Sequence, residues 1–377
     1  MKARHLAFTS TFLFALLACD GLRPSGPTSV EMQSAVPLPD AVRDGSSASP
    51  LDKQGLRPGS VVFYSARGGL TKIYALNPKA ANPDADAVQL TTGSGAELWP
   101  DVSPDGRYVA LASNSSGHNE IYVLDLRDKT KTLRNVSNIS GATDSNWPRW
   151  SPDGRRIAFH SNRDGNYHIF TVKADGTDLR RITTYATSAA ALDQFPDWSP
   201  NGRQLVFRRG EPPGNPGDIY VADADGEERN VRALTTNPAL DQMAAWSPNG
   251  RQIAFMSTRD GYPSVFVMTP AGDTPEHAAV NLTPRDQSSA NSDWASRAPA
   301  WSKDGEQIYF SSFRPSTGGA GSAFFELFVM KANGKKVRRL TMVAGEDGGP
   351  RSALMRRERG DHDSDNKQRD HDSDSHR

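Results

Sequence analysis

Short apolar runs recur in a fixed order between residues 61 and 341. Each unit has a first run such as Ile157-Ala158-Phe159, a second such as Ile169-Phe170-Thr171-Val172, and a shorter third such as Ile182-Thr183. Residues typical of tight turns separate the runs, and no long segment with a 3.6-residue apolar period interrupts them. Six such units can be counted, beginning with Val61-Val62-Phe63. The pattern predicts an all-β protein built from one repeated unit.

A tetrapeptide adds a fourth element to the unit. Ser-Pro-Asp/Asn-Gly starts at Ser103, Ser151, Ser199 and Ser247, 48 residues apart each time, and a degenerate copy, Ser302-Lys303-Asp304-Gly305, follows 55 residues later. A tryptophan precedes four of these five copies, at 150, 198, 246 and 301. We therefore expect four short antiparallel strands per unit, a, b, c and d, where strand a leads into the tetrapeptide. Four strands repeated radially predict a six-bladed β-propeller, whereas a linear β-solenoid, the alternative, usually has much shorter repeats.

The sequence contains six copies of strands b, c and d but only five obvious copies of strand a. Pro350 lies nine residues beyond Thr341, as Pro100 lies nine beyond Thr91. Residues 50–58 do not resemble the other copies. We predict that residues 350–354 supply strand a of the first blade, so that the C-terminal strand closes the ring and removes an open sheet edge.

The N-terminal segment has the features of an export signal. Lys2 and Arg4 precede a mostly apolar stretch, and the only cysteine, Cys19, follows Leu16-Leu17-Ala18. This resembles the lipobox of bacterial lipoproteins, which implies cleavage before Cys19 and its acylation; an ordinary secretory signal is the alternative. A single cysteine also excludes a disulfide scaffold and a cysteine-based zinc site. We expect a signal peptide over 1–18, a flexible tether over 19–55, the propeller over 56–354 and a disordered charged tail over 355–377.

Residues 150–165 read Trp-Ser-Pro-Asp-Gly-Arg-Arg-Ile-Ala-Phe-His-Ser-Asn-Arg-Asp-Gly. This motif resembles the WD40-like repeat of the TolB propeller family, and the resemblance covers roughly residues 59–354. It implies a six-bladed propeller, in the periplasm or on the cell envelope, that binds other proteins.

Composition and motifs argue against several other functions. Lys plus Arg and Asp plus Glu both count 44, so bulk charge does not favour a nucleic-acid binder. The chain has no HExxH, GxSxG or GxxxxGK[ST] motif, and we expect no catalytic activity, no cofactor and no bound metal. The tail repeats Asp-His-Asp-Ser-Asp at 361 and 370, which is a weak metal signal in a segment expected to be solvated.

Acidic residues recur in the connections from strand d to the next strand a. Glu97, Asp193 and Asp241 each stand six residues before the serine of a tetrapeptide, Asp144 stands seven before, and Asp347 stands three before Pro350. The d–a and b–c connections share one face of a propeller, so these acids are expected around one channel mouth. With Trp294, in an irregular loop on that face, they form a candidate binding rim. Alternatively, the acids pair with b–c arginines such as Arg67, Arg163, Arg208 and Arg259, or accept turn amides, and are structural.

These observations lead to one expected function and one alternative. We expect an exported monomer, lipid-anchored to the cell membrane or outer membrane and facing the periplasm or cell surface, that binds an envelope protein or peptide. We place that partner on the d–a/b–c face, because its loops break the repeat while the opposite face has short uniform turns. The alternative is a carbohydrate- or small-ligand-binding propeller, or an enzyme without a recognisable motif.

Overall fold

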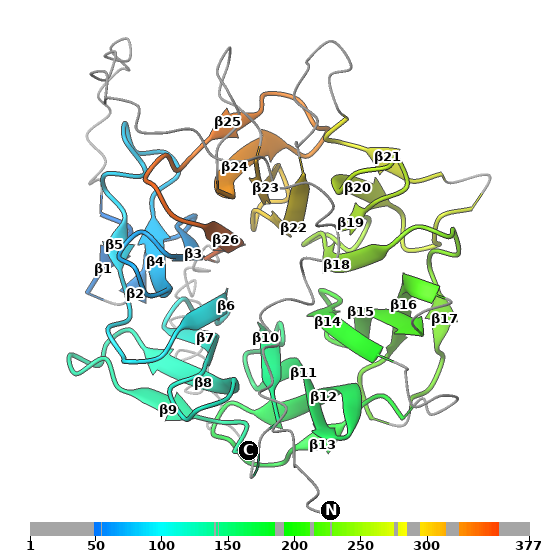
Figure 1. The fold of residues 1–377 in the computed structure, drawn as a ribbon, viewed down its shortest axis with the longest axis horizontal. Helices are drawn as coiled ribbons and strands as arrows, with labels where there is room; N and C mark the ends of the chain where they lie inside the picture. Colours follow the sequence, from blue (N-terminus) through cyan, green and yellow to red (C-terminus); the bar gives the residue numbers. More distant parts are fainter. Residues whose placement is uncertain are drawn as a thin grey trace, which may run out of the picture. The chain divides into compact units, whose positions relative to one another are not determined.

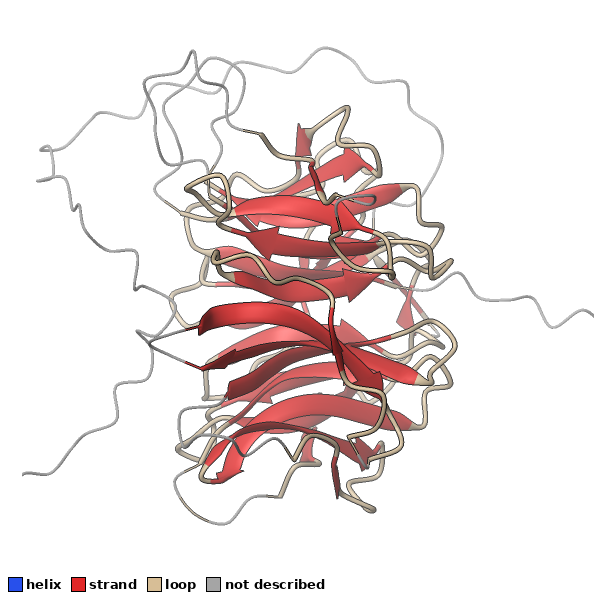
Figure 2. Cartoon of the chain, turned by 90° about the vertical axis from the view of Figure 1, so that its right-hand side faces the viewer, coloured by secondary structure: helices blue, strands red, loops and turns tan. Residues whose placement is uncertain are grey.

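The computed structural model describes residues 49–353, except 54, 139–140, 142, 185–191, 212–214, 227, 275–277, 285–294 and 314–323. The regular secondary structure of these residues consists of β-strands, which form six four-stranded antiparallel sheets and one two-stranded hairpin. The six sheets are arranged as blades around a central axis (Figure 1), and Figure 2 shows the blades from the side. The predicted six-bladed propeller is confirmed.

The blades follow one another along the chain, and within each the strands run a, b, c, d from the axis outwards. Blade 1 consists of β26 (Asp347–Ser352), β3 (Val61–Ser65), β4 (Lys72–Leu76) and β5 (Val88–Gln89); blade 2 of β6 (Glu97–Val102), β7 (Tyr108–Ser113), β8 (Glu120–Asp125) and β9 (Leu133–Asn135); blade 3 of β10 (Ser145–Trp150), β11 (Arg156–Asp164), β12 (Asn166–Lys173) and β13 (Arg180–Arg181); blade 4 of β14 (Leu192–Trp198), β15 (Gln204–Glu211), β16 (Asn215–Asp223) and β17 (Arg232–Ala233); blade 5 of β18 (Asp241–Trp246), β19 (Ile253–Ser257), β20 (Ser264–Met268) and β21 (Val280–Asn281); and blade 6 of β22 (Ser296–Trp301), β23 (Gln307–Ser312), β24 (Glu326–Lys331) and β25 (Arg338–Arg339).

Hydrogen bonds inside the tetrapeptide explain why it recurs at the a–b turn. In blade 3, Ser151 Oγ donates to Asp153 Oδ1 (2.6 Å) and accepts the N–H of Arg156 (2.9 Å), while Asp153 Oδ1 accepts the N–H of Arg155 (3.0 Å). The same three bonds form in the other four copies, with Asn in place of Asp in blades 4 and 5. Gly154 closes the turn at φ 71°, a left-handed conformation that glycine adopts without a steric cost.

The Thr or Ser at the end of each third apolar run also has a repeated role. The Thr183 hydroxyl accepts the N–H of Ile169, near the start of strand c, at 3.0 Å. The equivalent bond forms in all five remaining blades, where the acceptor is Thr91, Ser137, Thr235, Thr283 or Thr341. Strand d is shorter than strand c, so this strand-c N–H lies beyond the paired part of strand d. The side-chain hydroxyl supplies its hydrogen-bond acceptor.

Strand a carries a β-bulge in every blade, at the residue before the proline or its equivalent. The bulged residues are Trp99, Trp147, Phe195, Met243, Ala298 and Gly349, with φ between 52° and 59°. A left-handed conformation of a non-glycine residue costs on the order of 1–3 kcal/mol and persists only where the surroundings enforce it. A bulge also redirects the side chain relative to the regular alternation of the strand.

The side chains at the bulges fill the middle of the channel. Trp99 and Trp147 have ring centroids 4.4 Å apart, and those of Trp147 and Phe195 are 4.9 Å apart. Phe195, Met243 and Ala298 come from blades 4–6, yet they pack in one cluster with the core of blades 1–3, so the side chains meet across the axis. All five residues are at most 9% exposed. We call Trp99, Trp147, Phe195, Met243 and Ala298 the axial plug.

The ring closes as predicted. β26 pairs antiparallel with β3, from Asp347 opposite Ser65 to Ser352 opposite Val61, so the C-terminal strand is strand a of blade 1. The strand begins three residues before the predicted start at 350 and ends at Ser352, while residue 354, the last of the predicted strand, lies outside the described residues.

The segment that precedes blade 1 has its own structure. Residues at the end of the expected tether form a separate hairpin, β1 (Leu51–Asp52) with β2 (Gly55–Leu56), rather than a blade strand. The buried Leu56 donates its N–H to Gly106 O, in the a–b turn of blade 2, at 3.1 Å.

Several sequence predictions fall outside the described residues: the signal peptide, Cys19, most of the tether, Trp294 and the tail. Within the described part of the chain, no helix has the length and apolar character that crossing a bilayer requires.

Candidate functional site

Four of the predicted rim acids stand at the start of a strand a, but they do not form an open acidic surface. Glu97, Asp193, Asp241 and Asp347 are at most 2% exposed. The guanidinium of Arg209 donates two hydrogen bonds to the Asp193 carboxylate, from Nε (2.7 Å) and from Nη2 (2.8 Å). Ion pairs within a blade also join Asp241 to Arg259 (2.9 Å) and Asp347 to Arg67 (3.2 Å), and an ion pair between blades 2 and 1 joins Glu97 to Lys72 (3.2 Å). The structural alternative, buried acid–cation pairs, therefore describes these four residues.

Asp144 and Arg208 deviate from the expected positions by one residue each. The strand-a equivalent of Asp347 in blade 3 is Ser145, which lies opposite Ser161. Asp144 precedes it and accepts the N–H of Asn119 at 2.9 Å, a bond between blades 3 and 2. In blade 4 the partner of the acid is Arg209, whereas Arg208 donates through Nη1 to Gln194 Oε1 (2.5 Å). Neighbouring residues on a strand point to opposite faces, which explains the exchange.

The b–c arginines also pack on the aromatic core. The guanidinium of Arg209 lies 5.3 Å from the ring centroid of Phe207 and 5.4 Å from that of Tyr220. Arg67, Arg163 and Arg259 lie over the corresponding pairs of rings in blades 1, 3 and 5. Each of these cations thus caps the hydrophobic interior of its own blade, a cation–π arrangement that stabilises the fold.

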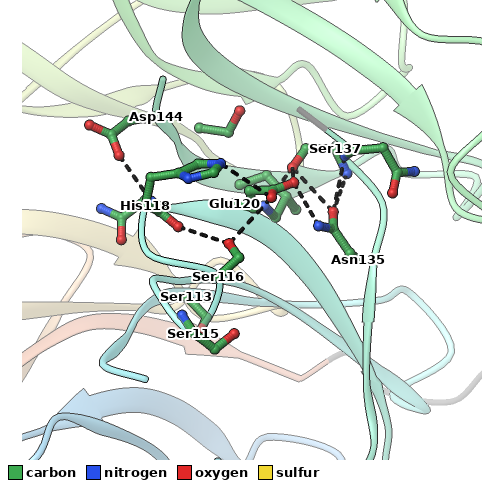
Figure 3. A network of polar contacts seen from close by, with 12 residues as sticks. Ser113, Ser115, Ser116, His118, Glu120, Asn135, Ser137 and Asp144 are labelled. Atoms are coloured by element: carbon green, nitrogen blue, oxygen red, sulfur yellow. Dashed lines mark hydrogen bonds and ion pairs between the residues drawn. The ribbon is translucent and has the colours of Figure 1, made fainter. Parts of the chain in front are cut away.

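Blade 2 lacks such an arginine, because Ser115 (Figure 3) stands where blades 1, 3 and 5 carry Arg67, Arg163 and Arg259. A second buried acid of blade 2, Glu120, receives hydrogen bonds from Asn135 Nδ2 (2.6 Å) and Ser137 Oγ (3.2 Å), and His118 Nε2 lies 3.3 Å from Glu120 Oε1. Ser116 Oγ also donates to Glu120 (3.3 Å). A serine nucleophile must instead donate to the imidazole of its base. The network in Figure 3 is therefore arranged as a cage for a carboxylate.

His160 is a structural acceptor as well. It is 4% exposed, its Nδ1 accepts the N–H of Phe195 at 3.3 Å, and its ring meets those of Tyr167 and Phe195 edge-on. Burial, together with the positive charges of Arg149 and Arg208, lowers the pKa of His160 to about 3. The imidazole is thus neutral at physiological pH and joins blades 3 and 4.

A cavity of about 240 Å³ opens at the other end of the channel, between the a–b turns. We call it the a–b cavity. Its walls include four tryptophans and four turn prolines: Trp150, Trp198, Trp246, Trp301, Pro104, Pro152, Pro200 and Pro248. Asp101, Asp197, Lys303 and Arg351 bring charge into it, and Ala245 and Ala300 line it on the side of blades 5 and 6.

The charges of the a–b cavity come mainly from one position of strand a, directly after the proline. Going around the ring, this residue is Arg351, Asp101, Arg149, Asp197, Ala245 and Ala300. Arg351 Nε lies 3.5 Å from Asp101 Oδ1, and Arg149 Nε lies 3.6 Å from Asp197 Oδ1. Asp101 Oδ2 accepts the backbone N–H of Trp150 (2.7 Å), and Asp197 Oδ2 accepts the backbone N–H of Trp246 (2.9 Å).

Burial dominates the electrostatics of this end of the channel. It lowers the pKa of the Arg149 guanidinium to about 9, lowers the pKa values of Arg351 and Lys303, and raises the pKa of the Asp197 carboxyl. This cavity was not predicted from the sequence, although the alternation of Arg and Asp after the strand-a proline was a readable signal.

Comparison with known proteins agrees with this architecture. A family model described as the TolB beta propeller domain matches residues 86–209 and 186–283, together just over half of the chain. The chain belongs to the TolB β-propeller domain family. No curated protein matches the sequence.

Solved structures with the same fold as this TolB-family chain belong to proteins of different kinds. TolB from Acinetobacter baumannii has a TM-score of 0.60 and 19% identity, with 79% of this chain and 67% of that chain covered. A chain of a nidogen/laminin complex has a TM-score of 0.57 and 13% identity, with 78% and 99% covered. Hydrazine synthase from Kuenenia stuttgartiensis has a TM-score of 0.59 and 12% identity, with 78% and 46% covered. Identities this low show the fold alone, and the fold supports both binding proteins and enzymes.

Proposed function

We propose that this TolB-family chain is an exported, lipid-anchored binding protein of the cell envelope, which uses its propeller to hold a protein or peptide partner and has no catalytic role. The partner docks on the d–a/b–c face. The observation that carries this proposal is a group of exposed apolar side chains in the d–a and b–c connections where blades 6 and 1 meet. We call these residues, Leu70, Phe324, Met342 and Val343, the seam patch.

The seam patch is relevant to binding because apolar side chains exposed together on a surface mark interaction sites. Met342 is 56% exposed, and the other three are 43–46% exposed. Polar contacts hold the backbone of two of these residues in place: Asp84 Oδ2 accepts the backbone N–H groups of Met342 (2.7 Å) and Val343 (2.8 Å). Asp84 is itself held by Arg67 Nη1 at 2.8 Å. Met342 and Val343 are thus presented on a fixed support, as an interface core requires.

The b–c hairpins on the other side of the same face are more regular. In blades 3 and 4 the b and c strands are eight or nine residues long, against five or six in the other blades. In blade 3 the strand pairing continues into the b–c hairpin as far as Asp164 opposite Asn166, although the hairpin from Ile157 to Val172 is no longer than the one from Val61 to Leu76 in blade 1. The resemblance to TolB and to a chain of a nidogen/laminin complex supports a binding role by analogy of fold.

A photo-crosslinking amino acid at residue 342 tests the docking face in intact envelopes. We expect a discrete crosslinked species from residue 342, and none from a matched probe at residue 280. Val280 is 57% exposed on the outer strand β21 and serves as the control. Met342→Asp with Leu70→Asp should reduce partner binding about tenfold or more, while surface changes of this kind alter stability by only about 0.5 kcal/mol. Equal crosslinking from residues 342 and 280 would contradict the proposed face.

The anchor is tested separately by Cys19→Ala. Lipid chains contribute about 0.8 kcal/mol of membrane affinity per buried CH₂, and several chains together give stable anchoring. We expect the parent protein in the membrane fraction after ultracentrifugation and the variant either soluble or unprocessed. A variant that sediments with membranes as a processed chain would show that Cys19 does not carry the anchor.

A further inference from the structure

Lys303 departs from the repeat at one defined place in the a–b cavity. The second residue of the tetrapeptide is proline in blades 2 to 5 and Lys303 in blade 6, and all five side chains line the cavity. The turn around Lys303 keeps the hydrogen bonds of the other copies, from Ser302 Oγ to Asp304 Oδ1 (2.5 Å) and from the N–H of Gln307 to Ser302 Oγ (2.9 Å). The fold therefore does not need a lysine here, and proline serves the same turn four times.

Lys303 is also the cation left over when the charges of the cavity are paired. Asp101 is taken by Arg351 and by the N–H of Trp150, and Asp197 by Arg149 and by the N–H of Trp246. Within the described residues, no hydrogen bond or ion pair is found for the Lys303 ammonium. Two Arg–Asp pairs plus one lysine leave one net positive charge. A partly desolvated charge without a partner is unfavourable, and an anion in the cavity would offset that cost.

Arg351 offers a second donor to the same anion. Its ion pair with Asp101 uses Nε, and its bonds to the carbonyl oxygens of Pro350 (3.0 Å) and Pro299 (3.4 Å) use Nη1. No hydrogen bond is found for Nη2 in the described part of the chain. A guanidinium nitrogen together with an ammonium suits the two oxygens of a carboxylate.

The remaining surface of the cavity determines what can be attached to that carboxylate. Ala245 and Ala300 leave space in blades 5 and 6, beside Lys303, where blades 1 to 4 have charged side chains. Trp246 and Trp301 form the wall there, and Trp246 is half-buried, whereas the other three cavity tryptophans are 6–7% exposed. A volume of about 240 Å³ equals about eight water molecules at roughly 30 Å³ each. The space fits a group the size of a single aromatic ring with its carboxylate.

We propose that the a–b cavity binds a small carboxylate with an apolar, preferably aromatic, body, held by the Lys303 ammonium and the Arg351 guanidinium and packed against Trp246 and Trp301. This site lies at the opposite mouth from the seam patch and does not depend on the proposed partner. The same group can be offered by a free acid or by the C-terminal residue of a peptide.

Calorimetric titration of the full-length protein with benzoate, accompanied by tryptophan fluorescence, tests the site. We expect saturable binding of benzoate and at least tenfold weaker binding of benzamide, its uncharged counterpart. Lys303→Pro restores the tetrapeptide of the other blades and should lower benzoate affinity at least tenfold without changing the melting temperature. Lys335→Gln removes an exposed lysine from blade 6 and should leave both affinities unchanged. Equal affinities for benzoate and benzamide, no binding of benzoate, or unaltered benzoate affinity in Lys303→Pro would each overturn the proposal.

A second titration separates the two sources of the carboxylate. A tripeptide ending in phenylalanine is compared with the same peptide carrying a C-terminal amide. Tighter binding of the free acid than of benzoate, lost on amidation, identifies a peptide C-terminus as the ligand. Benzoate binding without peptide binding identifies a free acid, and both results support the carboxylate site.

Discussion

A chain that ends at residue 345 will not form a stable propeller, whereas a chain that ends at residue 354 will unfold at the temperature of the full-length protein. The longer chain keeps β26, in which all six residues are buried. It also keeps the bonds of Ala353, whose N–H donates to Ser60 O (2.8 Å) and whose carbonyl accepts the N–H of Gly59 (3.3 Å). The shorter chain loses all of these contacts and strand a of blade 1 with them.

The effect should exceed the whole stability of the domain, which for a typical protein is about 5–15 kcal/mol. Without β26, the Arg67–Asp347 and Arg351–Asp101 pairs are broken, leaving Arg67 and Asp101 without these partners. β3 would also present an unpaired edge toward the axis. Circular dichroism melts and gel filtration of both truncated chains provide the measurement. A cooperative melt of the shorter chain near that of the full-length protein would show that another segment can close the ring.

Replacing Asp193 and Asp241 by Asn should destabilise the protein by about 3–5 kcal/mol, the cost of breaking buried ion pairs. The reason is that Arg209 and Arg259 would lose one of their carboxylates inside the protein, while Glu228 and Asp273 remain as their second partners. Chemical denaturation measures the loss. The matched control is Asp105→Asn with Asp153→Asn, which removes the same charge from the a–b turns of blades 2 and 3. In the corresponding turns of blades 4 and 5, Asn201 and Asn249 already make the same bonds. The control should change stability by less than about 0.5 kcal/mol.

The same pair of variants decides between the two interpretations of the acidic positions. If these acids only support the fold, partner crosslinking at residue 342 should be unchanged for the folded fraction of Asp193→Asn with Asp241→Asn. Loss of crosslinking at an unchanged unfolding midpoint would instead mean that the carboxylates are part of a binding rim.

The fold was predictable because its determinants are local and repeated. Ser151 and Asp153 make bonds within a few residues of themselves, and the same bonds recur in five turns, so spacing alone reveals them. Even the non-local closure was predictable, because Pro350 occupies the same place relative to Thr341 as Pro100 relative to Thr91.

The candidate sites were less predictable because they depend on which side of a strand a residue faces. Arg208 and Arg209 differ by one position, yet Arg209 binds Asp193 and Arg208 binds Gln194. Counting residues cannot separate the two without the register. The a–b cavity was missed for a related reason: a repeat is recognised by what its copies share, whereas Lys303 and Ala300 matter because they differ from the other copies.

The axial plug closes the central channel, so that the propeller has two separate mouths and no continuous passage. Trp99, Trp147 and Phe195 close the axis with rings in van der Waals contact, so neither an ion nor a polypeptide can be threaded from one face to the other. A ligand that enters one mouth must leave by the same mouth, and its residence time is set there. The two faces can therefore acquire separate specificities on a single ring, because a change at one entrance leaves the route to the other untouched.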